Sequence, residues 1–181
     1  MTRLAPLVPA DMDDAQRALY EVITGGPRNS ARLIAEDGSL RGPFDPMLRS
    51  PAVGEPLQAL GAAIRFGATL PADRRELAIL ATAVHWRCRF EWDAHLPIAV
   101  AAGLDTSTLS ALWDTGAASF ADETHGQIVE MVSEVFDRRT LSNESFVALV
   151  EVFGDAQAFE LLAVVGYYST LAILMNTFDI S

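Results

Sequence analysis

The chain has 181 residues, half of them hydrophobic, and a formal net charge of −11, which fits one globular domain with a sizeable core. This composition excludes a disordered chain, and the negative charge argues against nucleic acid and anionic membrane surfaces as partners. All thirteen basic residues are arginine, so Schiff-base chemistry on lysine and lysine-anchored pyridoxal phosphate are also excluded.

Cysteine content and apolar segments bear on the compartment. The chain has one cysteine, Cys88, so it has no intrachain disulfide, and nothing indicates an oxidising compartment. Residues 1–11 contain two prolines and read as too short for a signal peptide. Residues 161–178 are free of charge and approach the length of a membrane span, but no arginine or lysine flanks them. A buried helix fits better, so we expect a cytoplasmic protein without a membrane span.

Helix caps and breakers predict an all-α chain of about seven helices with no significant sheet. Asp11 or Asp13 can cap a helix that stops at Gly25, and residues 27–50 are expected to form a long ordered loop. Further helices are expected from Pro51 to Phe66, from Pro71 through Glu76 to a break near 86–88, and then over about 88–103, 105–113, 122–138, 142–153 and 155–178.

We interpret residues 1–181 as one domain, because no clear repeat, linker or low-complexity tract interrupts the chain. A motif-bearing helical core is expected over about 42–113. An N-terminal helix and loop would precede it at 1–41, and C-terminal helices would follow at 121–178.

The segment from Glu76 to His95 concentrates the residues that can carry chemistry. Glu91 and His95 are four residues apart, so on a helix they share a face and can touch. A carboxylate beside an imidazole orients the ring and raises its basicity, although a surface ion pair is the more frequent reason for this spacing. Glu76 lies in an apolar run, where a carboxyl group would have a raised pKa that suits a general acid. Cys88 lies one turn before Glu91.

These residues and their flanks resemble the alkylhydroperoxidase-D-like and carboxymuconolactone-decarboxylase-like superfamily. The matching strings are LPADRRE at 70–76 and HLPIAVAAG at 95–103. The segment before the motif, GPF at 42–44 and LRSP at 48–51, is similar to that of the longer members of the superfamily. The C-terminal part resembles them more loosely, at GYY (166–168) and Asn176. The resemblance implies the compact helical fold of that superfamily.

The resemblance also implies roles for the motif residues. It places Glu76 near the cysteine and the histidine as part of a proton relay. In the peroxidase branch, Cys88 would be the first cysteine of a Cys-x-x-Cys pair whose second member attacks the peroxide. Glu91 stands at that second position, so a dithiol cycle cannot operate within this chain. The substitution favours the decarboxylase branch.

Arginines and aromatic side chains around the motif indicate an anionic or aromatic-derived small-molecule substrate. The arginines are Arg65, Arg74, Arg75, Arg87 and Arg89. Arginine binds carboxylates in a bidentate way, so Arg65 or Arg75 is expected to hold a substrate carboxylate. Phe90 and Trp92 are expected to wall an apolar pocket. The ordinary alternatives are solvated helix faces for the arginines and core packing for the aromatic residues.

The favoured hypothesis is a cofactor-independent enzyme that decarboxylates, or moves a proton on, a small carboxylated or lactone-type substrate. His95 would be the general acid/base, Glu91 would orient it, and Glu76 would be the second carboxylic acid. One alternative is a hydroperoxide reductase that uses Cys88 with Glu76 and His95 as proton relay. Arg87 and Arg89 would then help to hold its thiolate.

Another alternative is a non-enzymatic oligomeric protein that binds a small molecule. No metal or other cofactor is expected. Glu76, Glu91 and His95 could in principle bind a metal, but the Glu-x-x-His repeats of di-iron bundles are absent from the sequence. The resemblance further implies a homo-oligomer, commonly a dimer, trimer or hexamer.

Overall fold

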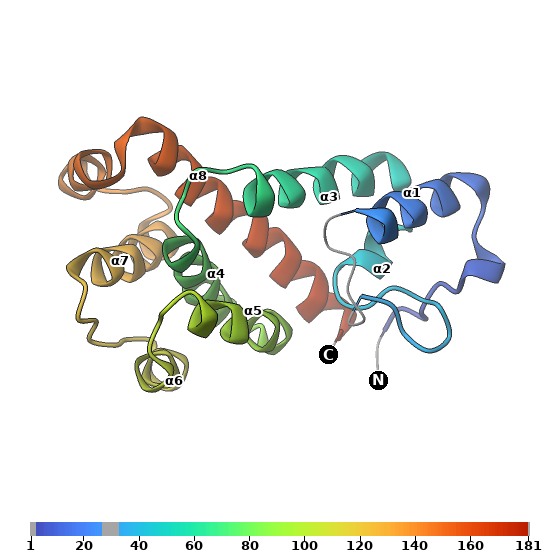
Figure 1. The fold of residues 1–181 in the computed structure, drawn as a ribbon, viewed down its shortest axis with the longest axis horizontal. Coiled ribbons are helices and arrows are strands. Elements are labelled where there is room, and N and C mark those ends of the chain that lie inside the picture. Colours follow the sequence, from blue (N-terminus) through green and yellow to red (C-terminus); the bar gives the residue numbers. More distant parts are fainter. Residues whose placement is uncertain (1–2, 27–32, 181) are drawn as a thin grey trace. The chain divides into compact units, whose positions relative to one another are not determined.

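The computed structural model describes residues 3–26 and 33–180, and the described chain is helical apart from an isolated antiparallel bridge between Ile34 and Leu40 (Figure 1). In chain order the helices are η1 (Pro9–Asp11), α1 (Asp14–Gly25), α2 (Phe44–Met47), α3 (Pro51–Phe66), α4 (Ala72–Trp86), α5 (Arg89–Ala101), α6 (Thr106–Thr115), α7 (Glu123–Arg138) and α8 (Asn143–Phe178). The expected all-α class is confirmed.

The chain forms two compact units. The first consists of Met1–Gly67 and Ile173–Ser181, and the second of Ala68–Ala172. The expectation of one domain stays a prediction.

In the first unit, α1 begins where the sequence predicts. The Asp13 side chain accepts a hydrogen bond from the Gln16 backbone N–H at 2.8 Å, and the Gln16 side chain accepts one from the Asp13 N–H at 3.0 Å. This capping box satisfies two amide groups that the first helical turn leaves unpaired. Leu19 and Ile23, one turn apart, then pack into a small apolar core.

The expected loop over 27–50 needs correction where the structure describes it. Its part at 27–32 lies outside the described residues. The remainder contains the Ile34–Leu40 bridge and the short helix α2, so it is not a loop throughout. Pro46 lies in the first turn of α2, where a missing backbone N–H leaves no helical hydrogen bond unmade, and the proline therefore does not prevent the helix.

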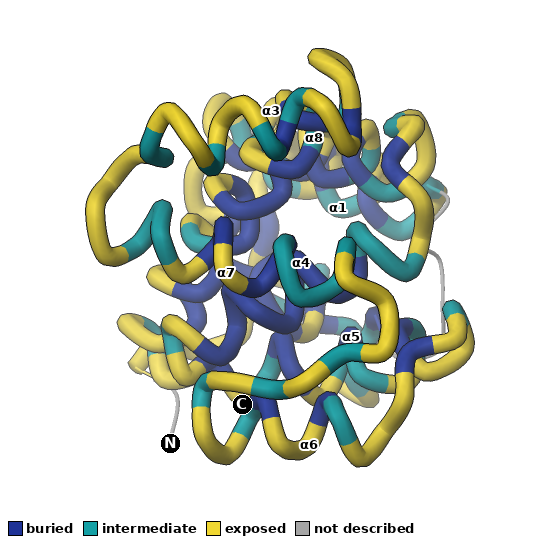
Figure 2. Tube along the Cα trace, turned by 90° about the vertical axis from the view of Figure 1, so that its left-hand side faces the viewer, coloured by how far each residue is buried: buried dark blue, intermediate teal, exposed yellow. Residues whose placement is uncertain are grey.

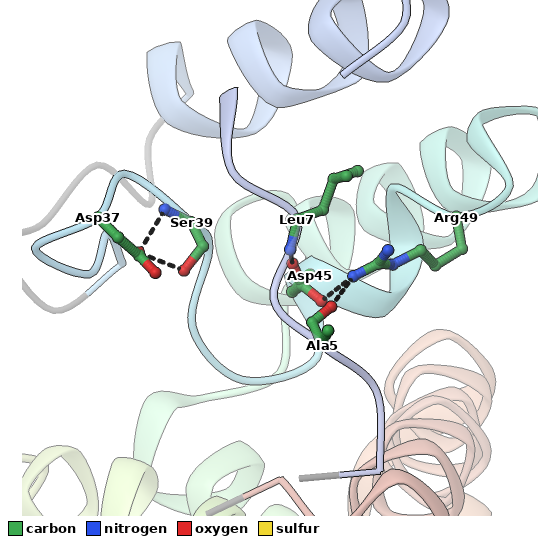
Figure 3. Close-up of polar contacts among 6 residues, drawn as sticks. All are labelled: Ala5, Leu7, Asp37, Ser39, Asp45 and Arg49. Carbon is green, nitrogen blue, oxygen red and sulfur yellow. Dashed lines mark hydrogen bonds and ion pairs between the residues drawn. The ribbon is translucent and has the colours of Figure 1, made fainter. Parts of the chain in front are cut away.

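A buried carboxylate on α2 holds the N-terminal segment of the first unit in place (Figure 3). Asp45, 7% exposed, accepts a hydrogen bond from the Leu7 backbone N–H at 2.7 Å. Its other oxygen accepts one from the Arg49 guanidinium at 3.0 Å, and Arg49 also donates to the Ala5 carbonyl. Two charge-assisted contacts thus compensate the burial of Asp45.

In the second unit, α4 is the central helix. The nine consecutive residues from Glu76 to Val84 are buried, and α4 packs against both α5 and α7 (Figure 2). A helix that is buried on all sides needs no polar face, which explains why the run is apolar apart from Glu76 and Thr82. Glu76 is the charged exception at its start.

The α4–α5 turn ends one helix and starts the next within two residues. Arg87 adopts a left-handed conformation with φ of 49°. Its N–H bonds to the Val84 carbonyl at 3.1 Å, and the Cys88 N–H bonds to the Ala83 carbonyl at 2.9 Å. This double hydrogen bond closes α4, and it makes Cys88 the N-cap residue of α5. The predicted break is confirmed.

Helix α8 contains the predicted break at Gly154, whose φ of 69° and ψ of 169° leave the helical region. It is also the one described helix that is long and apolar enough to cross a membrane by length and composition. Half of its most apolar stretch is buried inside the structure, and core helices pass the same test. Its role as an interior helix stays a prediction.

Candidate active site

His95 and Glu76 form a buried pair that joins α5 to α4. The His95 Nδ1 lies 2.6 Å from the Glu76 Oε2, and the two residues are 7% and 0% exposed. Because Nδ1 faces a carboxylate oxygen, we assign the proton of the neutral imidazole to Nδ1. Nε2 is then the basic nitrogen, and Glu76 holds the ring in that tautomer.

The expected pairing of Glu91 with His95 is wrong. Both residues are buried on α5, but neither Glu91 carboxyl oxygen has a hydrogen-bond partner among the described residues. The four-residue spacing brings the two side chains to one face, and Glu76 from α4 then takes the imidazole nitrogen that Glu91 was expected to orient.

Glu91 is instead a buried neutral acid. It is 2% exposed, and burial raises the pKa of its carboxyl from 4.5 to about 9. At neutral pH the group therefore keeps its proton and can donate a hydrogen bond. The sequence did not predict a raised pKa at Glu91, and the raised pKa expected at Glu76 stays a prediction.

Cys88 is a protonated thiol at neutral pH. Burial raises the pKa of this 1% exposed group to about 11. The Glu91 carboxyl also raises it, while the backbone N–H groups of Glu91 and Phe90 at the start of α5 lower it but do not compensate. A thiol with such a pKa is roughly one part in ten thousand thiolate at pH 7.

The two arginines that flank Cys88 do not hold a thiolate. Arg87 donates from its Nη1 to the Trp113 carbonyl at 2.7 Å. Arg89 forms an exposed ion pair with Asp93 at 2.8 Å. Their charges are thus used elsewhere, which corrects the expectation that they activate the cysteine.

Arg75 and Tyr168 also contact the pair. The Arg75 Nε donates to the Glu76 Oε1 at 3.4 Å, from a side chain that is 14% exposed. The buried Tyr168 ring of α8 meets the His95 ring edge to face at 5.0 Å. Arg75, expected to bind substrate, thus contacts Glu76. Tyr168 was not among the predicted site residues, because an apolar helix does not reveal which aromatic ring will face the histidine.

The remaining predicted substrate-binding residues are dispersed. Trp92 is 4% exposed and packs on Trp113 of α6 at 4.9 Å between ring centroids, which is a core contact. Phe90 is half-buried in the first turn of α5. Arg65 belongs to the first unit, where its guanidinium lies 5.6 Å from the Phe66 ring centroid. Substrate-binding roles for these residues stay predictions.

No cluster of three or more His, Cys, Asp or Glu side chains that could hold a metal ion occurs among the described residues. Metal ligands must be deprotonated, so a Glu91 carboxyl that keeps its proton up to about pH 9 is a poor ligand at neutral pH. The expected lack of a metal or cofactor stays a prediction.

Residues 51–125 match the model of the carboxymuconolactone decarboxylase family. The match supports, for this segment, the predicted resemblance to carboxymuconolactone-decarboxylase-like and alkylhydroperoxidase-D-like proteins. The segment includes Glu76, Cys88, Glu91 and His95, so all four predicted catalytic residues lie in the part that the family shares.

Solved structures support the same fold. The chain is similar to a protein from Ralstonia eutropha JMP134 described as an alkylhydroperoxidase AhpD core and an uncharacterized peroxidase-related protein, with a TM-score of 0.75, 16% identity, and 99% of this chain and 91% of that chain covered. It is also similar to an uncharacterized peroxidase-related protein from Silicibacter sp. TM1040, with a TM-score of 0.76 and 11% identity. That alignment covers 99% of this chain and 91% of that chain. The apo structure of the debrominase Bmp8 is similar with a TM-score of 0.67 and 15% identity, over 97% of this chain and 89% of that chain.

At these identities the similarity shows the fold alone. A comparison with curated proteins finds no match. The reaction must therefore be argued from the site.

Proposed function

We propose that this protein is a cofactor-independent acid–base enzyme that decarboxylates, or transfers a proton on, a small carbonyl substrate of the carboxylated or lactone type. The observation that carries the proposal is the buried pair of His95 and Glu76, 2.6 Å apart, with the protonated Glu91 one helical turn from the histidine. This arrangement supplies a base and an acid at the same pH, which such chemistry requires.

In the proton-transfer reaction, the Nε2 of His95 removes a proton from a carbon beside the substrate carbonyl. The electron pair of the broken C–H bond moves to the carbonyl oxygen and forms an enolate. Glu91 donates a hydrogen bond to that oxygen, which stabilises the charge more strongly in a buried site than it would in water. The imidazolium, held by Glu76, then returns the proton to carbon.

In the decarboxylation reaction, the bond between the carboxylate carbon and its neighbour breaks. Carbon dioxide leaves, and the electron pair again reaches the carbonyl oxygen as an enolate beside Glu91. His95, after taking up one proton from solvent, donates that proton to the carbon and completes the product. Both reactions use the same residues because both pass through an enolate.

Cys88 is not part of this proposal. A hydroperoxide reductase needs a thiolate, whereas burial raises the pKa of the Cys88 thiol to about 11. The single-cysteine alternative is therefore not favoured.

A homo-oligomer in the cytoplasm belongs to the proposal. In the second unit, α8 leaves Phe146 and Phe159 54% and 74% exposed, and large exposed apolar side chains of this kind suit a subunit interface. Static light scattering that gives a monomer mass would refute the oligomer.

The reaction can be tested without knowing the natural substrate. A panel of β-keto acids, unsaturated lactones and their carboxylated derivatives is incubated with enzyme in D₂O. Carbon-bound proton exchange is followed by NMR, and carbon dioxide release is measured in parallel. His95→Asn keeps an amide N–H that can bond to Glu76 but removes the base, so it should lose about 10²- to 10⁴-fold in rate.

The matched control is His125→Gln, because His125 pairs with Asp73 at 2.9 Å through Nε2 and the glutamine amide can replace that contact. It should leave the rate unchanged. Equal turnover by the wild type and His95→Asn would remove the histidine from the mechanism.

A further inference from the structure

We propose that Arg75 is a positioning residue that sets the proton affinity of the Glu76–His95 pair and thereby keeps His95 available as a base near neutral pH. The consequence for catalysis rests on the proposed function, but the effect on the pair is measurable by itself. The sequence led us to expect Arg75 at a substrate carboxylate, whereas the structure gives it a different contact.

The two oxygens of the Glu76 carboxylate contact different groups, one a cation and the other an imidazole. Its Oε1 lies 3.4 Å from the Arg75 Nε, and its Oε2 lies 2.6 Å from the His95 Nδ1. Glu76 is 0% exposed and the Arg75 side chain 14%, so water screens this interaction only partly. Adjacent residues on a helix point in different directions, and the 3.4 Å contact therefore requires the arginine side chain to turn back toward Glu76.

Counting charge gives the direction of the effect. Without a bound proton the pair carries −1, and Arg75 brings the local sum to zero. One added proton raises the sum to +1, which is costly in a buried site. If Arg75 is removed, the unprotonated pair is a buried anion without this neighbouring cation, and the same proton brings its own charge to zero. The pair must then bind its proton more tightly, and His95 would remain protonated at neutral pH.

Other titratable groups near the pair on α5 and α8 do not replace this positive charge. Tyr168 and its neighbour Tyr167 come from α8, and their rings meet at 5.2 Å. Glu91 and Cys88 come from α5 and the turn before it. In their protonated forms these four groups are all uncharged, so they cannot balance the Glu76 carboxylate. Arg75 is a cation in contact with it.

Neighbouring Arg74 offers a matched control. It has the same charge and the adjacent position on α4, but its guanidinium lies over the Phe153 ring at 5.1 Å. A general effect of positive charge on this helix would appear in variants of both arginines. An effect through the Glu76 carboxylate would appear in variants of Arg75 alone.

The test is an NMR titration of histidine-labelled protein. The chain has only three histidines, so each ring signal can be assigned with one substitution, and His85 and His125 serve as internal references. In Arg75→Gln, the midpoint of the His95 titration should rise by about one pH unit or more, the range that a nearby charge produces. Arg75→Lys should restore most of the wild-type midpoint, and Arg74→Gln should match the wild type.

An unchanged or lowered His95 midpoint in Arg75→Gln would overturn the proposal, as would an equal rise in Arg74→Gln. If Arg75→Gln does not fold, Glu76→Gln gives a second test. It leaves the Arg75 charge unbalanced beside the histidine, so the His95 midpoint should fall, and a midpoint that stays or rises refutes the idea.

These outcomes are separate from those of the activity assay. A protein without turnover but with the expected titration shifts would disprove the proposed reaction and keep the role of Arg75. An active enzyme without the titration shifts would disprove the role of Arg75 and keep the proposed reaction.

Discussion

Replacing Glu91 with glutamine removes the proton equilibrium of a buried carboxyl while keeping its size and shape. The wild-type group is 2% exposed, and burial raises the pKa from 4.5 to about 9. In the unfolded chain the carboxyl ionises near its ordinary pKa, because water solvates it there. The folded and unfolded states therefore differ in bound protons between about pH 4.5 and pH 9.

The sign of the effect follows from that difference. Within the window the folded state holds the proton and the unfolded state has lost it, so the free energy of unfolding falls as pH rises. The slope is about 1.4 kcal/mol per pH unit, and between pH 5 and pH 7.5 the loss amounts to roughly 3 kcal/mol. Below pH 4.5 the contribution is fully present, and above pH 9 both states are ionised and the slope vanishes.

Urea denaturation of wild type and Glu91→Gln at several pH values from 5 to 8.5 measures this contribution. Other titrating groups are common to both proteins, so they cancel in the difference. The stability of Glu91→Gln relative to wild type should rise by about 3 kcal/mol from pH 5 to pH 7.5. Parallel pH profiles for the two proteins would refute a neutral buried Glu91, and with it the acid of the proposed mechanism.

Three further outcomes are expected. In the folded protein at pH 7.5, iodoacetamide should modify Cys88 at least about 100-fold more slowly than a free thiol, because the group is protonated and buried, and mass spectrometry of native and urea-unfolded samples measures this. Gly54→Ala should cost more than about 2 kcal/mol by denaturation, because an added Cβ would lie 2.2 Å from the Met47 carbonyl oxygen. Its control, Gly126→Ala, meets no atom within 4 Å and should gain about 0.5–1 kcal/mol in α7. Asp45→Asn should lose about 1–3 kcal/mol in thermal or urea unfolding, because it removes the charge shared by one buried and one part-buried contact.

Local sequence signals were sufficient for most of the helical framework. Pro51 begins α3, Asp122 caps α7, and Gly154 marks the break in α8, each as predicted. These boundaries depend on hydrogen bonds and backbone angles within a few residues, which a sequence displays directly. The short helix α2 was missed because its four residues show no periodic pattern.

From the sequence alone, spacing and apolar surroundings singled out Glu76, Glu91 and His95 as candidate site residues, but not Tyr168. Only the tertiary structure decided their partners. The contact of Glu76 with His95 spans 19 residues and depends on how α4 packs against α5, which no local pattern encodes. Packing likewise decided that Glu76 receives polar contacts from Arg75 and His95, whereas Glu91 receives no hydrogen bond from the described residues. The proton on Glu91 follows from that difference, because desolvation without a partner penalises the charged form of a carboxyl group.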